Sequence, residues 1–271
     1  MRVGNQLGKA LDLSFLRNRW LGMRDRLRRS FARRQLILKS KLMDPTERSA
    51  VIFAPHHDDE TLGCGGIIAT KRQRGAPVWV VFLTDGSKCY PESVPMTPEE
   101  ISNLRRREAF QALEILGVDP LHVHFLQQPD GGLQYLLESS RQALLSQLLE
   151  LLRQIAPQEI YVPYRNDAHP DHMLTYALVR EALQVLRWQV DMWQYFVSSL
   201  WKVQYLRDLT PTDFENLYRV SIHQVQGQKR KALAVYRSQY LPIAPNIAAV
   251  LGRGFMDYYS SPYELYLKTG A

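Results

Sequence analysis

Apolar and polar positions alternate on two length scales after Pro45. Short apolar runs, rich in β-branched and aromatic residues, mark four expected strands: Ala50–Ala54, Val78–Leu83, His122–Leu126 and Glu159–Val162. The segments between these runs are long enough to hold crossover helices. Strands that alternate with helices in this way form right-handed βαβ units. The pattern therefore predicts an α/β fold, a Rossmann-like and mostly parallel sheet with helices on both faces.

Two of the connecting segments carry the boundary signals of helices. Pro98–Leu116 follows Thr97, a residue type that caps helix N-termini, and it ends before Gly117. Proline suits the first helical position, where the backbone N–H has no partner within the helix. The second segment, Leu136–Ile155, ends before Pro157. We expect both segments to be helices that cover the sheet.

The N-terminal 40 residues have a pattern of their own. Apolar residues recur there at roughly helical spacing among arginines: Leu13, Leu16, Trp20, Leu21, Met23, Leu27 and Phe31. We expect a basic amphipathic helix in an extension of residues 1–47, followed by one domain over residues 48–271. Such a helix either lies on an anionic membrane surface through residues 1–40 or packs on its own domain or a partner subunit.

Composition narrows the class of protein. With 271 residues, of which 45% are hydrophobic and 23% charged, the chain can bury a sizeable core, which excludes disorder of the whole chain. The net charge of +7 is local, because residues 1–48 hold 13 Lys or Arg against 4 Asp or Glu. The rest of the chain carries slightly more acidic than basic residues, so we expect no nucleic-acid partner.

Cysteine content and hydropathy indicate the compartment. The two cysteines, Cys64 and Cys89, cannot build a disulfide framework and lack zinc-ribbon spacing. We find no run of about 20 apolar residues and no continuous signal-peptide core. We therefore expect a cytoplasmic protein, which would sit at the inner face of the membrane if its leader docks there.

Clusters of histidine and carboxylate follow two of the expected strands. Residues 55–60 read Pro-His-His-Asp-Asp-Glu, and residues 167–172 read Asp-Ala-His-Pro-Asp-His. In parallel sheets, ligands bind beyond the carboxyl ends of the strands, so we expect the two clusters to share one pocket. This density of ligands indicates a metal hydrolase.

The residues of the first cluster can take different chemical roles. His56 and Asp59, three residues apart in a turn, can converge on one ion, while Asp58 between them remains free for proton transfer. His172 from the second cluster completes a set of two histidines and one carboxylate. This set suits catalytic Zn²⁺, with Fe²⁺ as the alternative. The ion would lower the pKa of a bound water towards about 7.

The first cluster resembles the signature of the PIG-L/LmbE-like N-acetylglucosaminyl deacetylases, usually His-Pro-Asp-Asp-Glu, with His57 in place of the proline. Further segments resemble the family's later motifs in the same order: Thr84-Asp85-Gly86, Arg105–Ala109, Leu116-Gly117-Val118, Pro129-Asp130-Gly131, His169–His172, Lys231-Ala232-Leu233 and Ser238-Gln239. The resemblance spans about residues 49–265 and leaves the basic leader uncovered.

The resemblance implies a role for individual residues. His56, Asp59 and His172 would be the zinc ligands, and Asp58 the general base. His169 would face the reacting carbonyl, where it stabilises the oxyanion or protonates the leaving amine.

Two further roles follow from the same resemblance. Asp171 would orient and charge the imidazole of His169, and Arg105 would contact the sugar. Each role has a structural alternative: Asp58 and Asp171 as helix caps, Arg105 as one more cation on a solvated helix face. We assign no role to His57, and we expect the aromatic residues around Trp193 and Tyr195 to pack in the core rather than stack on a sugar.

The expected function is that of a zinc-dependent hydrolase that removes the N-acetyl group from an N-acetylated amino sugar in a glycan, glycolipid or sugar-conjugate precursor. One alternative keeps the metal but changes the bond, to another amide or a phosphoester. A second alternative is a catalytically inactive, membrane-docked protein that binds sugar. Loss of turnover in Asp58→Asn would separate the enzyme from the inactive protein.

Overall fold

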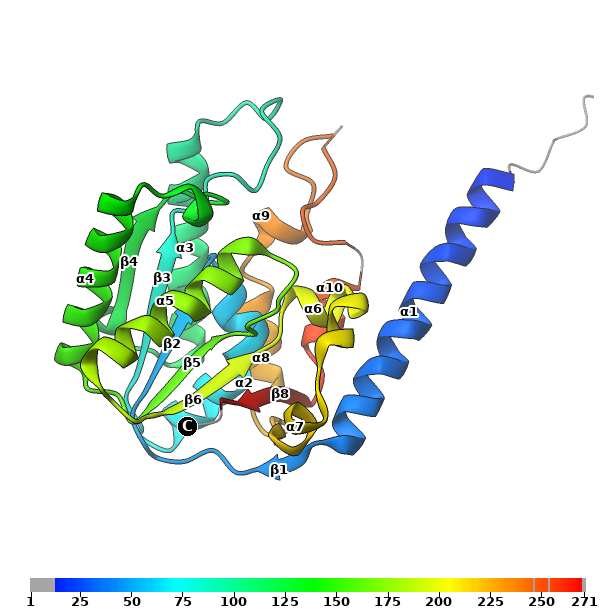
Figure 1. Ribbon diagram of the computed structural model, residues 1–271. Coiled ribbons are helices and arrows are strands. Elements are labelled where there is room, and N and C mark those ends of the chain that lie inside the picture. The colour runs from blue at the N-terminus through cyan, green and yellow to red at the C-terminus, as the bar shows by residue number, and fades with distance from the viewer. Residues whose placement is uncertain (1–12, 246, 253, 270–271) are drawn as a thin grey trace, which may run out of the picture.

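An eight-stranded sheet forms the centre of the computed structural model, which describes residues 13–245, 247–252 and 254–269 (Figure 1). The strand order is β1-β7-β8-β6-β5-β2-β3-β4. The strands are β1 (Lys41–Met43), β2 (Ala50–Ala54), β3 (Val78–Thr84), β4 (Val123–Gln128), β5 (Glu159–Pro163), β6 (Asp191–Tyr195), β7 (Leu217–Ser221) and β8 (Tyr263–Lys268). Neighbouring strands are parallel, except that β8 runs antiparallel to β6 and β7. The sheet is thus mostly parallel, as predicted.

Helices cover both faces of this sheet. The longer ones are α1 (Leu13–Lys39), α2 (Asp59–Gln73), α3 (Pro98–Leu116), α4 (Glu138–Ile155), α5 (Pro170–Leu186) and α8 (Gln226–Leu233). The short α-helices are α6 (Ser198–Trp201), α7 (Pro211–Glu215), α9 (Arg237–Tyr240) and α10 (Phe255–Tyr259). Three 3-10 turns are η1 (Pro120–His122), η2 (Leu133–Tyr135) and η3 (Val203–Asp208).

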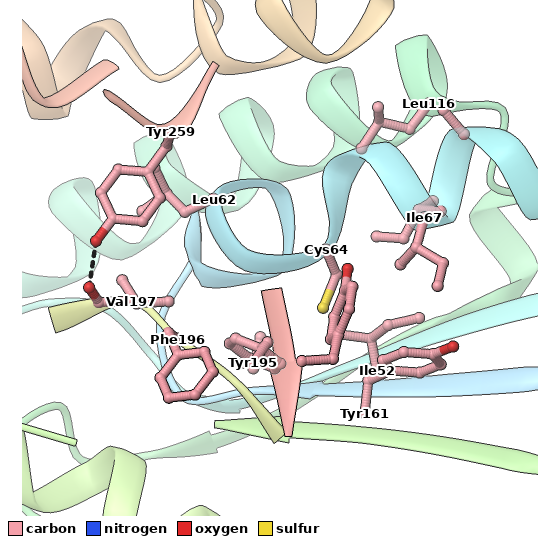
Figure 2. Close-up of a cluster of buried hydrophobic side chains, with 14 of the residues drawn as sticks. Ile52, Leu62, Cys64, Ile67, Leu116, Tyr161, Tyr195, Phe196, Val197 and Tyr259 are labelled. Carbon is pink, nitrogen blue, oxygen red and sulfur yellow. Dashed lines mark hydrogen bonds between the residues drawn. The ribbon is translucent and has the colours of Figure 1, made fainter. Parts of the chain in front are cut away.

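The alternation of side chains along β2 divides the core in two. Ile52 packs on one face with residues of α2, α3 and α8, and Val51 packs on the other with residues of α4 and α5. Figure 2 shows the hydrophobic core on the face that Ile52 occupies, where Tyr195 and Tyr161 lie beneath α2. The aromatic residues Trp193 and Tyr195 are buried there, which confirms the expectation of core packing.

The predicted helix Pro98–Leu116 has the expected ends. The Thr97 hydroxyl accepts a hydrogen bond from the Glu100 N–H at 3.2 Å, and the Glu100 carboxylate accepts one from the Thr97 N–H at 2.7 Å. Gly117 closes the helix with φ of 84°, in the left-handed region that favours glycine. The four predicted strands are also present; Ala50–Ala54 has the predicted bounds, and the ends of the other three differ by at most two residues.

The order of the strands determines where the site lies. The chain passes from β2 to β3 and β4 on one side, then returns to β5 and β6 on the other side of β2. The carboxyl ends of β2 and β5 are therefore adjacent at a topological switch point, where open α/β sheets bind ligands. The first cluster follows β2, and the second follows β5.

Helix α1 confirms the predicted N-terminal helix, and β1 after it pairs with β7 at the sheet edge. Residues 1–12 and the side chains of residues 13–21, among them Leu16 and Trp20, lie outside the described part of the chain. The boundary between extension and domain at residue 47 stays a prediction. Among the described residues, no helix has the length and apolar character that crossing a bilayer requires.

Candidate active site

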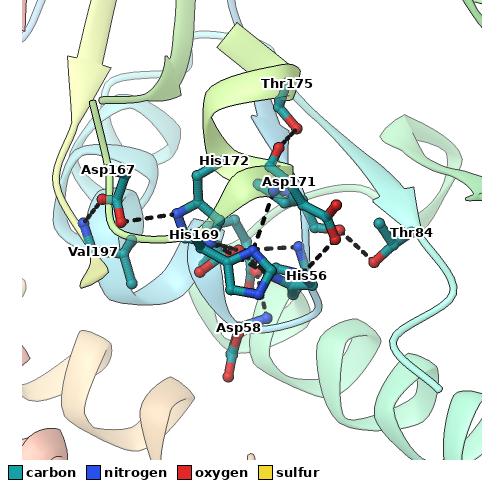
Figure 3. A network of polar contacts seen from close by, with 12 residues as sticks. His56, Asp58, Thr84, Asp167, His169, Asp171, His172, Thr175 and Val197 are labelled. Atoms are coloured by element: carbon teal, nitrogen blue, oxygen red, sulfur yellow. Dashed lines mark hydrogen bonds and ion pairs between the residues drawn. The ribbon is translucent and has the colours of Figure 1, made fainter. Parts of the chain in front are cut away.

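Three side chains from the two clusters meet at the carboxyl ends of β2 and β5; two of these side chains, His56 and His172, are labelled in Figure 3. His56 Nδ1 lies 3.1 Å from Asp59 Oδ2, His172 Nε2 lies 3.3 Å from the same oxygen, and the two nitrogens are 3.3 Å apart. We call these three donor atoms the donor triangle. All three residues are at most 9% exposed. The structure thus brings together the metal ligands predicted from sequence.

The donor triangle has the dimensions of a zinc site. Ligand bonds of about 2.0–2.1 Å in tetrahedral geometry separate neighbouring donors by about 3.3 Å. Behind the triangle, Asp167 Oδ1 lies 3.6 Å from His172 Nδ1, and Asp167 Oδ2 accepts a hydrogen bond from the Ser199 hydroxyl at 3.1 Å. A carboxylate that backs a ligating imidazole is the usual outer support of a metal site. The residues present therefore fit a zinc ion.

The site is strongly acidic in its electrostatics. Burial disfavours protonation of His172, yet Asp59 and Asp167 outweigh burial and raise the pKa of His172 to about 9. The pKa of His56 is likewise raised well above normal, because Asp130, Asp171 and Asp59 outweigh its burial. Both imidazoles attract a proton to the place where a metal cation would sit. A cation is the ligand that this field favours.

Two more carboxylates approach His56 from its other nitrogen. Asp171 Oδ2 lies 3.2 Å and Asp130 Oδ1 3.3 Å from His56 Nε2. Asp171 is fixed in turn by the N–H groups of Gly131 and Leu133, at 2.8 and 3.2 Å. Its carboxylate therefore positions His56, whereas the family resemblance implies that it orients His169.

His169 is held by the backbone of Asp171 instead. The Asp171 N–H donates to His169 Nδ1 at 3.2 Å, and burial, reinforced by His56 and His172, lowers the pKa of His169 to about 4. The imidazole is therefore neutral near pH 7, with Nδ1 as the acceptor. Its proton must then sit on Nε2, which makes Nε2 a hydrogen-bond donor.

Asp58 has a strained backbone and a buried carboxylate. Its φ of 147° is unusual for a residue with a side chain, and strain of this kind clusters at functional sites. Its side chain makes no capping hydrogen bond to α2, in contrast to the alternative that Asp58 merely caps the helix. Burial raises the pKa of Asp58 to about 8, although the neighbouring Arg105 guanidinium opposes this shift.

Arg105 lies on α3 and is only 3% exposed, so it is not a cation on a solvated helix face. Its guanidinium donates to the carbonyl oxygens of His57 and Gly86, at 2.8 and 3.2 Å, and Nη2 lies 3.5 Å from Asp58 Oδ1. Arg105 therefore ties the loops after β2 and β3 together beside the base. Its contact with a sugar stays a prediction.

His57, which replaces the proline of the family signature, is buried beside the triangle. Its ring packs against Phe82 and Phe125 at centroid distances of 4.9 and 5.3 Å, and neither ring nitrogen has a hydrogen-bond partner among the described residues. The ring lines a cavity of about 360 Å³ between the carboxyl end of β4 and the start of α3. His57 takes no part in the triangle.

Sequence reasoning leaves two residues of this site without a role. Asp130, which follows β4, reaches His56, and Asp167 backs His172. The Pro-Asp-Gly motif around Asp130 predicts a loop, but it does not predict how close that loop lies to the end of β2. The position of Asp167 within the second cluster is a signal for a support to His172, whereas its hydrogen bonds to the loop after β6 appear only in three dimensions.

Comparisons with known proteins agree with this geometry. Residues 51–183 match the model of the family described as PIG-L, GlcNAc-PI de-N-acetylase. The chain is 29% identical over 188 residues to a 1D-myo-inositol 2-acetamido-2-deoxy-alpha-D-glucopyranoside deacetylase of Mycobacterium sp. (strain KMS), a match that covers 62% of this chain and 60% of the relative. It is 30% identical over 142 residues to a probable N-acetyl-alpha-D-glucosaminyl L-malate deacetylase 2 of Bacillus anthracis, with 52% and 61% covered. The chain thus spans about three-fifths of the length of these two curated relatives.

The fold also matches solved structures of proteins with different reactions. GalB, the 4-carboxy-2-hydroxymuconate hydratase of Pseudomonas putida KT2440, has a TM-score of 0.56 and 21% sequence identity, over 79% of this chain and 83% of that one. Because this likeness concerns the fold alone, it leaves the reaction open. The family match covers both clusters of the site, so residues 51–183 of this chain form a PIG-L, or LmbE-like, region.

Proposed function

We propose that this protein is a metal-dependent hydrolase that removes the acetyl group from an N-acetylated amino sugar. The observation that carries the proposal is the donor triangle of His56, Asp59 and His172, with sides of 3.1–3.3 Å, within the region that matches the PIG-L family. Zn²⁺ is the ion we propose, and Fe²⁺ would suit the same donors. Once bound, the ion would lower the pKa of water and polarise the acetyl carbonyl.

Asp58 is the proposed general base. Asp58 directly precedes Asp59 of the triangle and its side chain is not engaged as a helix cap, so its oxygens are available to accept the proton of the attacking water. Burial raises the pKa of Asp58 to about 8, and Arg105, 3.5 Å away, together with a bound cation would favour the ionised carboxylate that a base requires. In this proposal Arg105 also contacts the sugar, through whichever N–H groups the loop carbonyls leave free.

His169 is the proposed donor to the reacting amide. With Nδ1 engaged by the Asp171 N–H, its Nε2–H can donate to the carbonyl oxygen as negative charge develops there. When the carbon–nitrogen bond breaks, the proton that Asp58 took from the attacking water can pass to the leaving amine, and His169 keeps its own proton. Asp171 serves this step through its backbone N–H and serves the triangle through its contact with His56. Acetate and a free amino sugar are the products.

The names of the relatives support the sugar part of the substrate. The mycobacterial protein is named for an inositol conjugate and the Bacillus protein for a malate conjugate, and both conjugates contain an N-acetylated glucosamine unit. The amino sugar is the unit they share, and the attached group differs. We therefore propose an N-acetylated amino sugar as the substrate class.

The test measures bound metal and acetate release on the same protein samples. N-acetylglucosaminides with different attached groups serve as substrates for wild type, Asp58→Asn and the remote control Asp25→Asn. We expect about one metal ion per chain in all three proteins. Acetate release should fall about 100- to 10,000-fold in Asp58→Asn and remain at the wild-type level in Asp25→Asn.

Two other outcomes would replace the proposal. Metal binding without acetate release from any of these substrates would point to another bond, or to a hydration reaction such as the one for which GalB is named. Acetate release that is equal in wild type and Asp58→Asn would remove Asp58 as the base.

A further inference from the structure

Helix α1 contacts the rest of the molecule through one side. The guanidinium of Arg29 lies 3.9 Å from the ring centroid of Trp201, and Arg33 donates to the carbonyl of Tyr263 at 2.8 Å. Leu36 is 5% exposed and belongs to the core. At 3.6 residues per turn, positions 29, 33 and 36 fall within about 60° of the helix circumference. This is the packed side of α1.

The opposite side of α1 presents apolar side chains to solvent. Four residues form what we call the apolar stripe: Met23, Leu27, Phe31 and Leu38, which are 56, 63, 65 and 67% exposed. They fall within about 80° of the circumference, centred about 160° from the packed side. Further packing of α1 on its own domain would therefore leave the stripe exposed. One side of α1 packs on its own domain, as the self-packing alternative expects. The other side, which carries the apolar stripe, is open to a partner.

The charges around the stripe indicate which partner fits. Arg28 and Arg34 are exposed and lie on or beside the stripe. Between residues 22 and 39, the acidic side chain is Asp25, which projects towards the packed side by its helical position. Apolar side chains flanked by arginines suit a surface that is apolar beneath and anionic above. An anionic lipid bilayer has this layering.

The position of α1 relates the stripe to the active site. Ser40 lies where β1 and β7 begin, whereas Arg29 contacts Trp201 of α6, which follows the carboxyl end of β6. The helix therefore runs from the amino ends of the strands towards their carboxyl ends as residue numbers fall. Residues before Arg29 extend past the end of the sheet that carries the donor triangle (Figure 1).

We propose that α1 lays its apolar stripe on an anionic membrane and holds the active-site end of the sheet beside the lipid surface. The rest of the protein stays on the water side, because the packed side of α1 lies opposite the stripe. A corollary rests on the proposed function: the amino sugar is carried on a membrane lipid, so that its acetyl group can reach the site while the lipid remains in the bilayer.

The test uses the full chain and two matched variants. Leu27→Glu/Phe31→Glu places two negative charges on the stripe, and Leu121→Glu/Val185→Glu places the same charge on exposed apolar positions elsewhere. Sedimentation is measured with vesicles of phosphatidylcholine alone and of phosphatidylcholine mixed with phosphatidylglycerol. We expect wild type and the control to bind the mixed vesicles, and the stripe variant to bind at least about tenfold more weakly.

Two results would overturn the membrane proposal. Equal vesicle binding by wild type and the stripe variant would show that the stripe does not meet the lipid. No vesicle binding by wild type, together with a dimer in light scattering that the stripe variant abolishes, would assign the stripe to a second copy of the chain.

Activity assays separate this proposal from the proposed function. Acetate release from a water-soluble N-acetylglucosaminide should be the same in wild type and in both variants, because the main contacts of α1 are with α6, η3, β7 and β8, none of which carries a residue of the donor triangle. Release from an N-acetylglucosaminyl lipid in mixed vesicles should fall at least about tenfold in the stripe variant alone. Equal release from the lipid by both variants would overturn the corollary, and absence of any release would count against the proposed function without affecting vesicle binding.

Discussion

The two ends of the central strands both hold buried charges, but they differ in how these charges are matched. At the amino ends, Glu159 accepts hydrogen bonds from Thr46 and Arg48 at 2.7 and 2.8 Å and lies 2.6 Å from Lys71 Nζ. The Lys71 ammonium also donates to the carbonyls of Thr46 and Arg48. We call this group the amino-end cluster. Its charged groups are balanced by their protein partners.

The carboxyl ends lack this balance. The carboxylates of Asp59, Asp130 and Asp171 all lie against His56. His172 Nδ1 and Asp167 Oδ1 are 3.6 Å apart, which is too far for a hydrogen bond. A buried polar group without a partner costs about 1–3 kcal/mol, and an excess of carboxylates costs more. Buried charge alone therefore does not identify a functional site. What identifies the site is an excess of buried negative charge that a bound cation would neutralise.

The largest effect is expected when the donor triangle itself is broken. His172→Ala removes one of its three donors, so metal affinity should fall more than about 100-fold and acetate release should be lost with it. Metal analysis and an acetate assay measure the two effects. A chelator should lower the melting temperature of wild type, because bound metal stabilises the folded state, and should leave that of His172→Ala unchanged. If the chelator lowered both melting temperatures equally, the ion would bind elsewhere.

Breaking the amino-end cluster should have the converse effect. Lys71→Met leaves Glu159 with less compensation in a site where Lys71 is fully buried, and should cost about 3–5 kcal/mol of the free energy of unfolding. Urea denaturation measures this loss, while metal content per folded chain should stay at the wild-type level. Lys231→Met, at an exposed position on α8, is the control and should change stability by less than about 0.5 kcal/mol. A loss of metal in Lys71→Met would show that the two ends are coupled.

The difference between the ends also explains what the sequence predicts well. The bounds of α3 follow from neighbouring residues, because Thr97 and Gly117 act within one turn of the helix they limit. The donor triangle follows from two short clusters placed after strands. In each case the interaction that sets the structure involves residues a few positions apart, so it can be predicted from the local sequence.

Features that depend on contacts distant in the chain are not predicted. Strand β8 enters the sheet antiparallel between β6 and β7, and no local pattern sets that order. The contact of Asp130 with His56 depends on the distance between the ends of β4 and β2. Whether the carboxylate or the backbone of Asp171 faces His169 depends on the loop after β4, whose N–H groups bind the carboxylate.

A smaller effect is expected behind the triangle. Asp167→Asn keeps the shape of the side chain but removes its charge behind His172, so metal affinity should fall about 10- to 100-fold. Competition with a chromophoric chelator measures the affinity. Asp191→Asn is the matched control, because Asp191 pairs with Arg48 and Lys268 at the amino ends, and it should leave the affinity unchanged. Equal loss in both variants would mean that overall charge, rather than the support of His172, sets the affinity.

The smallest expected effect concerns His57, which stands at the carboxyl ends but outside the donor triangle. Phe at this position would keep the packing against Phe82 and Phe125 and would remove two buried nitrogens that lack partners. We therefore expect His57→Phe to raise the free energy of unfolding by about 1 kcal/mol, measured by urea denaturation, with metal affinity unchanged. His57→Ala, the control for packing, should lower stability because it leaves a cavity. A loss of stability in His57→Phe would mean that the nitrogens do bind a partner in the adjoining cavity, and would extend the unbalanced region of the carboxyl ends beyond the metal site.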